Sequence, residues 1–116
     1  MLRDKEVNNI LNIQKYYSND EVNETMQLRL LRIDETMLPF MNGDGLEDVP
    51  TFMECVSYIE YTKKHISYLE RVSRITTWRD MFVKLDQLLI YSKETQHRDL
   101  AGVSIVKGVI RPIWVR

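Results

Sequence analysis

The chain has 116 residues, of which 44% are hydrophobic and 28% charged, and its formal net charge is −1. This composition is that of one ordinary globular domain and excludes an intrinsically disordered chain. A single cysteine, Cys55, excludes an intrachain disulfide and favours a reducing compartment, and no apolar run approaches the ~18 residues of a membrane span. We therefore expect a soluble cytoplasmic protein, or one of a host-cell interior, with no membrane partner.

The first segments of the chain predict two helices. Residues 3–16 carry Val7, Ile10 and Leu11 at helical spacing, and the polar stretch at residues 18–20 provides a cap for a second helix. Apolar residues then recur at intervals of 4, 3, 4 and 3, at Met26, Leu30, Ile33, Met37 and Phe40. Pro39 is expected to end this second helix because proline removes a backbone donor.

Residues 42–50 contain two glycines, a proline and three acids, which predicts a loop. A third helix is predicted through residue 73 from the spacing of Phe52, Val56, Ile59, Ile66, Leu69 and Val72. Thr76 or Thr77 then caps a fourth helix, whose predicted apolar face consists of Trp78, Phe82, Leu85, Leu88 and Leu89. Asp80, Lys84 and Asp86 are expected on its solvent side.

The last segment changes character, because β-branched residues replace straight-chain helix formers. A hairpin is predicted about Lys107 and Gly108, with Pro112 confining its second strand to a sheet edge. The predicted fold is mainly α: a single domain over residues 1–116, formed by a four-helix antiparallel bundle over 1–99 and a short extended or β-like segment over 100–116.

Motifs that would supply chemistry are missing from the sequence. The loop at residues 40–51 resembles the start of a calcium-binding loop, but Phe40 and Thr51 stand where a carboxylate and a bidentate glutamate are needed. His65, His97 and Cys55 have no short spacing suited to a metal, and there is no phosphate loop or nucleophile motif. We expect no catalytic residues, no metal, no cofactor and no small-molecule substrate, and hence no enzyme.

Charge is distributed unevenly along the chain. Residues 1–60 hold 5 Lys and Arg against 12 Asp and Glu, a balance of −7, whereas residues 61–116 hold 11 against 5, a balance of +6. Such a split suggests a partner for at least one half, because a charged surface steers oppositely charged molecules toward it. The alternative is that the two halves face one another within the fold.

The leading functional hypothesis is a non-catalytic protein-protein interaction module: a small regulator or adaptor, or a subunit of a homo-oligomer. The predicted partner-binding residues are Ile113, Trp114 and Val115, since apolar residues at a terminus are hard to explain as core. The Ile, Asn, Lys and Tyr usage is typical of an AT-rich genome, which suggests a phage or mobile-element origin. No protein family is identified from these residues.

The alternative hypothesis is nucleic-acid binding by the basic half. Five basic residues fall within 17 positions, with aromatic residues between them: Lys63, Lys64, Arg71, Arg74 and Arg79. Phosphate binding needs a cluster of cations, and exposed aromatic rings can stack on bases. The weakness is geometric, because Arg79 belongs to the next predicted helix.

Overall fold

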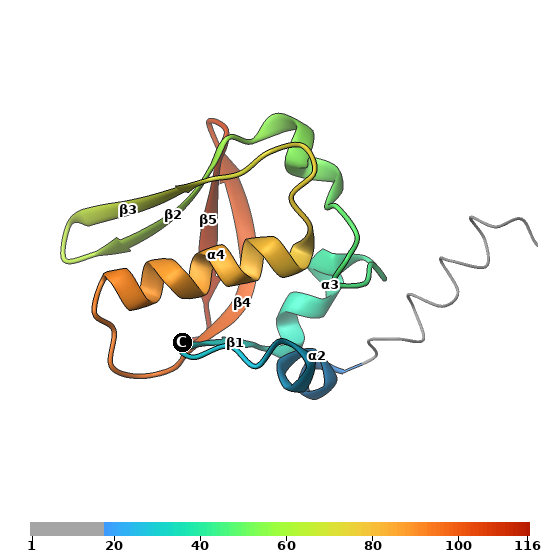
Figure 1. The fold of residues 1–116 in the computed structure, drawn as a ribbon, viewed down its shortest axis with the longest axis horizontal. Coiled ribbons are helices and arrows are strands. Elements are labelled where there is room, and N and C mark those ends of the chain that lie inside the picture. The colour runs from blue at the N-terminus through green and yellow to red at the C-terminus, as the bar shows by residue number, and fades with distance from the viewer. Residues whose placement is uncertain (1–17) are drawn as a thin grey trace, which may run out of the picture.

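A computed structural model describes residues 18–116 as an α+β fold in which one long helix lies across a five-stranded mixed sheet (Figure 1). The predicted four-helix bundle is wrong. The helices are α2 (Asn19–Met26), α3 (Leu38–Met41) and α4 (Trp78–Tyr91), with 3-10 turns η1 (Glu35–Met37) and η2 (Thr51–Cys55). The strands are β1 (Leu31–Ile33), β2 (Tyr58–Lys63), β3 (Ile66–Arg71), β4 (Arg98–Val106) and β5 (Val109–Trp114). The first predicted helix, residues 3–16, lies outside the described residues.

The sheet is built from two antiparallel hairpins set side by side. Its order is β1-β4-β5-β2-β3, with β4 antiparallel to β5, β2 antiparallel to β3, and parallel contacts joining β1 to β4 and β5 to β2. The parallel ladder between β2 and β5 is short, because it pairs only Tyr58 with Val109 and Ile59 with Ile110. Beyond it the two hairpins diverge (Figure 1).

Helix α4 follows its predicted boundaries and supplies much of the core. The Thr77 hydroxyl accepts a hydrogen bond from the Asp80 amide and begins the helix. All five residues of the predicted apolar face are buried: Trp78, Phe82, Leu85, Leu88 and Leu89. They pack against the inward side of the sheet, including Ile59 and Ile110. Asp86, expected on the solvent side, is also buried.

The third predicted helix, over residues 51–73, is instead the short turn η2 followed by the hairpin β2–β3. The chain alternates there between buried and accessible side chains, as Ile59 and Tyr61 show, which is the two-residue period of a strand. Lys64 and His65 form the turn with positive φ angles of 51° and 70°. Such turns usually contain asparagine or glycine, so this pair gave no turn signal.

The second predicted helix, expected to run from a cap at residues 18–20 to near Pro39, is broken into separate pieces. Helix α2 does begin after a Ser18 cap, as expected, but it ends at Met26 because Gln27 adopts a left-handed conformation with φ 51°. The chain then forms strand β1, turn η1 and helix α3. The apolar seam predicted as one helix face is therefore distributed over several short elements that all contribute to the core.

The C-terminal hairpin is confirmed, with Lys107 and Gly108 as its turn. However, β5 lies in the middle of the sheet, between β4 and β2, so the predicted edge position of Pro112 is wrong. Pro112 lies two residues after Ile110, the last residue paired with β2, and because it has no N–H to donate to β2 the ladder stops there.

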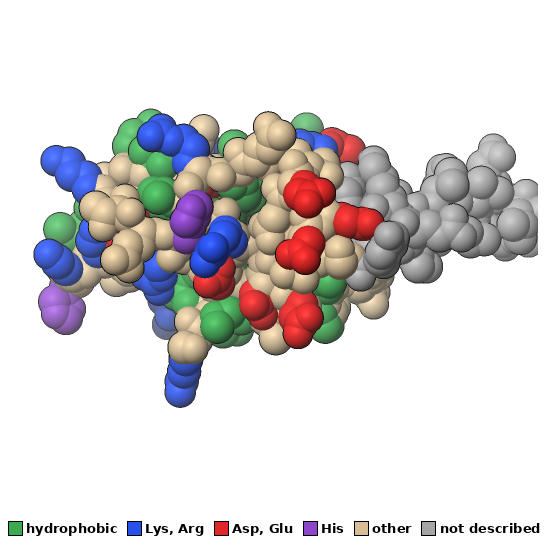
Figure 2. Space-filling view, turned by 90° about the horizontal axis from the view of Figure 1, so that it is seen from below, with side chains coloured by type: hydrophobic (Ala, Val, Ile, Leu, Met, Phe, Trp, Pro, Cys, Tyr) green, Lys and Arg blue, Asp and Glu red, His purple; other side chains and the backbone are tan. Residues whose placement is uncertain are grey.

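Charge is separated in space as well as in sequence. On the face shown in Figure 2, acidic side chains gather toward the right of the described residues and most basic side chains lie toward the left. Over residues 18–116, no helix combines the length and apolar character needed to cross a membrane.

Candidate functional site

The two edge strands of the sheet differ in whether their outward backbone groups have partners. At the β1 edge, the Asn23 side-chain amide donates to the Ile33 carbonyl and accepts from the Ile33 N–H, both at 2.8 Å. The Asp86 carboxylate accepts from the amides of Arg29, Leu30 and Leu31 at 3.2, 2.8 and 2.9 Å. Two side chains therefore occupy the place that a further strand would take.

Among the residues that the structure describes, none covers the β3 edge in this way. The two-residue turn makes Lys63 and Ile66 a hydrogen-bonded pair, and from there bonded and non-bonded pairs alternate along the hairpin. The bond from the Val72 N–H to the Ser57 carbonyl continues this alternation. It follows that the backbone groups of Ser67, Leu69 and Arg71 point away from β2.

These three residues are exposed, and their backbone groups have no hydrogen-bond partner among residues 18–116. All six residues of β3 pair with β2 in unbroken register, without a bulge or a proline. Natural edge strands are usually shortened, bulged or covered, because an open edge is a template for another strand. Strand β3 is thus a regular edge strand of six residues whose outward backbone groups can accept another strand.

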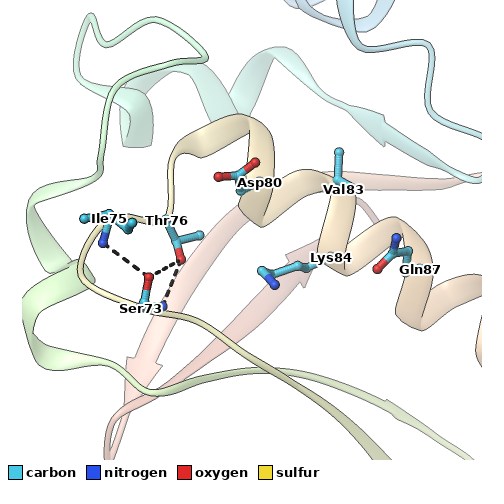
Figure 3. Close-up of a pocket in the computed structure, with 7 residues that line it drawn as sticks. All are labelled: Ser73, Ile75, Thr76, Asp80, Val83, Lys84 and Gln87. Carbon is cyan, nitrogen blue, oxygen red and sulfur yellow. Dashed lines mark hydrogen bonds between the residues drawn. The ribbon is translucent and has the colours of Figure 1, made fainter.

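A hollow of about 370 Å³ lies between α4 and the loop that connects β3 to α4 (Figure 3). Its helical side consists of Asp80, Val83, Lys84 and Gln87, which are spaced as one stripe of a helix. Its loop side consists of Ser73, Ile75 and Thr76. The hollow is open to solvent and half polar, so it suits a side chain of a docked segment better than an enclosed small molecule.

The loop side of this hollow is held by hydrogen bonds within the loop. The Thr76 hydroxyl accepts from the Ser73 amide at 2.9 Å, and the Ser73 hydroxyl accepts from the Ile75 amide at 3.4 Å (Figure 3). The Ile75 side chain is left 79% exposed. The loop thus holds an exposed isoleucine beside the open strand, where it can contact another chain.

An ion pair joins the hollow to the open strand. Lys84 Nζ of α4 lies 3.7 Å from Glu70 Oε1 of β3, so the helix stripe and the strand edge are adjacent. Exposed apolar side chains lie along the strand, with Ile66 at 57% and Leu69 at 52% exposure. We define the binding edge as the backbone of Ser67, Leu69 and Arg71 together with this hollow.

The five basic residues predicted for nucleic-acid binding do not form one surface. Arg79 lies near the start of α4, where it pairs with Glu47 and contacts the Met26 sulfur at 3.8 Å. Lys63 donates to the carbonyl of Ser92 at 3.0 Å and so neutralises the C-terminal end of α4.

The other three basic residues lie along the binding edge. Lys64 is in the hairpin turn, Arg71 ends β3 and Arg74 follows it in the loop. Arg71 lies over the ring of Tyr58 with 6.0 Å from its guanidinium carbon to the centroid, and none of the three forms an ion pair among residues 18–116. Their charges are therefore available to a partner.

The apolar C-terminal residues predicted for partner binding are split between the core and the surface. The Trp114 ring packs edge-on against Tyr61 at 5.8 Å and lies under Arg98, whose guanidinium carbon is 4.6 Å from the ring centroid. Ile113 and Val115 are 44% and 45% exposed. The indole is thus already engaged within the described fold.

A half-buried polar network lies beside that indole. The Tyr61 hydroxyl donates to Glu94 Oε1 at 2.6 Å and accepts from Arg98 Nη1 at 3.0 Å, and Lys63 Nζ lies 3.5 Å from Glu94. Burial and the bond to Glu94 raise the pKa of Tyr61 to about 12. The same bond lowers the pKa of Glu94. Every member of the network has a partner, so the network rigidifies this part of the fold.

The acidic loop that resembled a calcium site has structural roles. Asp44 accepts from the Trp78 indole N–H at 2.9 Å, and Asp48 accepts from the Gly45 amide at 2.7 Å. Across the part of the chain that the structure describes, no group of three or more His, Cys, Asp or Glu side chains is placed to hold a metal ion.

Sequence reasoning missed the binding edge because it assigned β3 to a helix. The signal that could have found it is the alternation of apolar and polar residues over 59–62, which fits a strand. Comparisons with protein-family models, with curated proteins and with solved structures returned no significant match.

Proposed function

We propose that this protein is a non-catalytic interaction module that binds an extended segment of a partner protein by adding it as a sixth strand beside β3. The observation that carries the proposal is the contrast between the two sheet edges. Side chains close the β1 edge, whereas no group of residues 18–116 bonds the outward backbone groups of Ser67, Leu69 and Arg71 at the β3 edge. In strand addition, backbone hydrogen bonds supply affinity and neighbouring hollows supply specificity.

The surroundings of β3 fit that role. A strand laid along β3 places alternate side chains on its two faces. Those on the α4 side meet Ile66 and the hollow formed with Val83 and Gln87, and those on the other side meet Leu69. The site thus offers a ladder of backbone bonds flanked by apolar contacts on both faces.

Leu69 provides a direct test, because its N–H points outward and takes no part in the ladder to β2. Leu69→Pro removes this donor while the β2–β3 pairing remains, since proline is tolerated where the N–H of an edge strand faces solvent. Leu69→Ala is the matched control, which shortens the side chain and keeps the donor.

The probe is a labelled peptide, acetyl-Ser-Thr-Val-Thr-Val-Ser-amide, titrated by fluorescence anisotropy. We expect Leu69→Pro to weaken binding about tenfold and Leu69→Ala about threefold at most, since one backbone hydrogen bond and the partner left unsatisfied correspond to about 1.4 kcal/mol. Amide exchange at Ser67 and Arg71 should slow when the peptide binds. Equal binding by the proline and alanine variants would contradict strand addition.

The nucleic-acid alternative keeps one supporting observation, the row of Lys64, Arg71 and Arg74. Arg79 and Lys63 no longer support it, because Arg79 is paired with Glu47 and Lys63 caps the C-terminal end of α4. Three unpaired cations fit a short acidic segment as well as a nucleic-acid backbone, so this observation does not favour nucleic acid.

A further inference from the structure

The charges around β3 indicate which kind of extended segment the binding edge takes. Lys64, Arg71 and Arg74 carry three positive charges without ion-pair partners among the described residues. The acid within the strand, Glu70, is already paired with Lys84. Asp80 is the one acid among the residues that line the hollow.

The three cations are placed at both ends of the strand. Lys64 lies in the turn two residues before Ile66, the first residue of β3, and Arg71 and Arg74 lie at the far end of the strand. A bound strand that covers Ser67 to Arg71 would therefore have a cation near each of its ends. The apolar contacts of Ile66 and Leu69 lie between them.

We infer that the partner of the binding edge is an acidic extended peptide segment, with a short β-branched or apolar centre and a glutamate or aspartate toward each end. The inference rests on the proposed function, because it assumes that the segment pairs with β3. A second copy of this chain fits less well, since antiparallel self-pairing about Leu69 would set Lys64 against Arg74 and bring like charges together.

The test compares three peptides of equal length that differ in charge. They share the Thr-Val-Thr-Val centre and end in glutamate, serine or lysine on both sides. We expect the glutamate peptide to bind about tenfold more tightly than the lysine peptide at low salt, because exposed ion pairs contribute up to about 1 kcal/mol each. The difference should shrink at high salt, where surface charges are screened.

Two triple variants test whether the preference for the glutamate peptide depends on the three cations of the binding edge. Lys64→Gln, Arg71→Gln and Arg74→Gln combined should abolish the preference for glutamate while the serine peptide still binds. The control variant combines Arg29→Gln, Lys107→Gln and Arg116→Gln, which removes the same charge from exposed residues outside the binding edge and should keep the preference.

Failure of the inference and failure of the proposed function give different results. Equal binding of the three peptides, together with loss in Leu69→Pro, overturns the acidic partner and keeps strand addition. Glutamate-selective binding that survives in Leu69→Pro overturns strand addition. A single-stranded thymidine oligonucleotide that binds more tightly than the glutamate peptide, and is lost in the first triple variant, overturns the acidic peptide in favour of nucleic acid.

Discussion

Asp86 shows how one side chain can organise a strand that lies far away in the sequence. Its carboxylate accepts three backbone N–H groups from residues 29–31, which precede it by 55 to 57 positions. Helical periodicity located Asp86 on α4 but placed it on the solvent side. Its true surroundings depend on a strand brought in from the N-terminal region, which no local pattern in the sequence can reveal.

Tyr61 is the residue whose replacement tests the half-buried polar network most directly. Tyr61→Phe removes the donor to Glu94 and the acceptor for Arg98 without removing the ring that packs on Trp114. We expect the free energy of unfolding at neutral pH to fall by about 1 to 2 kcal/mol, the usual range for a hydrogen bond to a charged group in a partly accessible site. Urea unfolding of both proteins measures this difference.

The pH dependence of that difference follows from the two shifted groups. The pKa of Glu94 is lowered on folding, so its contribution is present above its ordinary value of 4.5 and is lost as pH falls through the folded pKa. The pKa of Tyr61 is raised from 10.0 to about 12, so its contribution is present below pH 10 and is lost as pH rises toward 12. The difference in free energy of unfolding between wild type and Tyr61→Phe should therefore be largest between about pH 5 and pH 10. Tyr91→Phe, at a ring 70% exposed, serves as the control and should change little at any pH.

At the scale of elements, Asn23 is the residue that closes the β1 edge. Asn23→Ala leaves the N–H and carbonyl of Ile33 without their partner, and the Ile33 side chain is 1% exposed. We expect a loss of about 2 kcal/mol in stability and faster amide exchange at Ile33, measured by NMR. Asn19→Ala on the same helix is the comparison and should leave Ile33 protected. Unchanged exchange at Ile33 in Asn23→Ala would mean that something else covers this edge.

The elements that could be predicted are those whose signals are local. Helix α4 has a threonine cap and an unbroken apolar face, and the C-terminal hairpin has a glycine in its turn. The turn of hairpin β2–β3 has no sequence signal, because Lys64 and His65 are not typical turn residues and adopt positive φ only where the paired strands hold them. The apolar residues of this hairpin also happen to recur at three- and four-residue intervals, which is the spacing of a helix face. The binding edge depended on this hairpin and was missed with it.

At the scale of the whole molecule, its two tryptophans report on different regions. Trp78 is 1% exposed at the start of α4 and is bonded to Asp44, whereas Trp114 packs on Tyr61 in β2. We expect fluorescence and circular dichroism to give coincident unfolding midpoints in both Trp78→Phe and Trp114→Phe, because one core joins the two regions. A fluorescence midpoint that precedes the circular dichroism midpoint in either variant would show that residues 18–116 unfold in two steps.

The asymmetry of the two edges has a consequence for polymerisation. A sheet with two open edges can grow from both sides, and such growth leads to fibrils. Here Asn23 and Asp86 block one side, so the sheet accepts a strand only beside β3. Under the proposed strand addition, each molecule would therefore bind one free end of a growing β-structure and offer no new end of its own, so it would stop growth at that end.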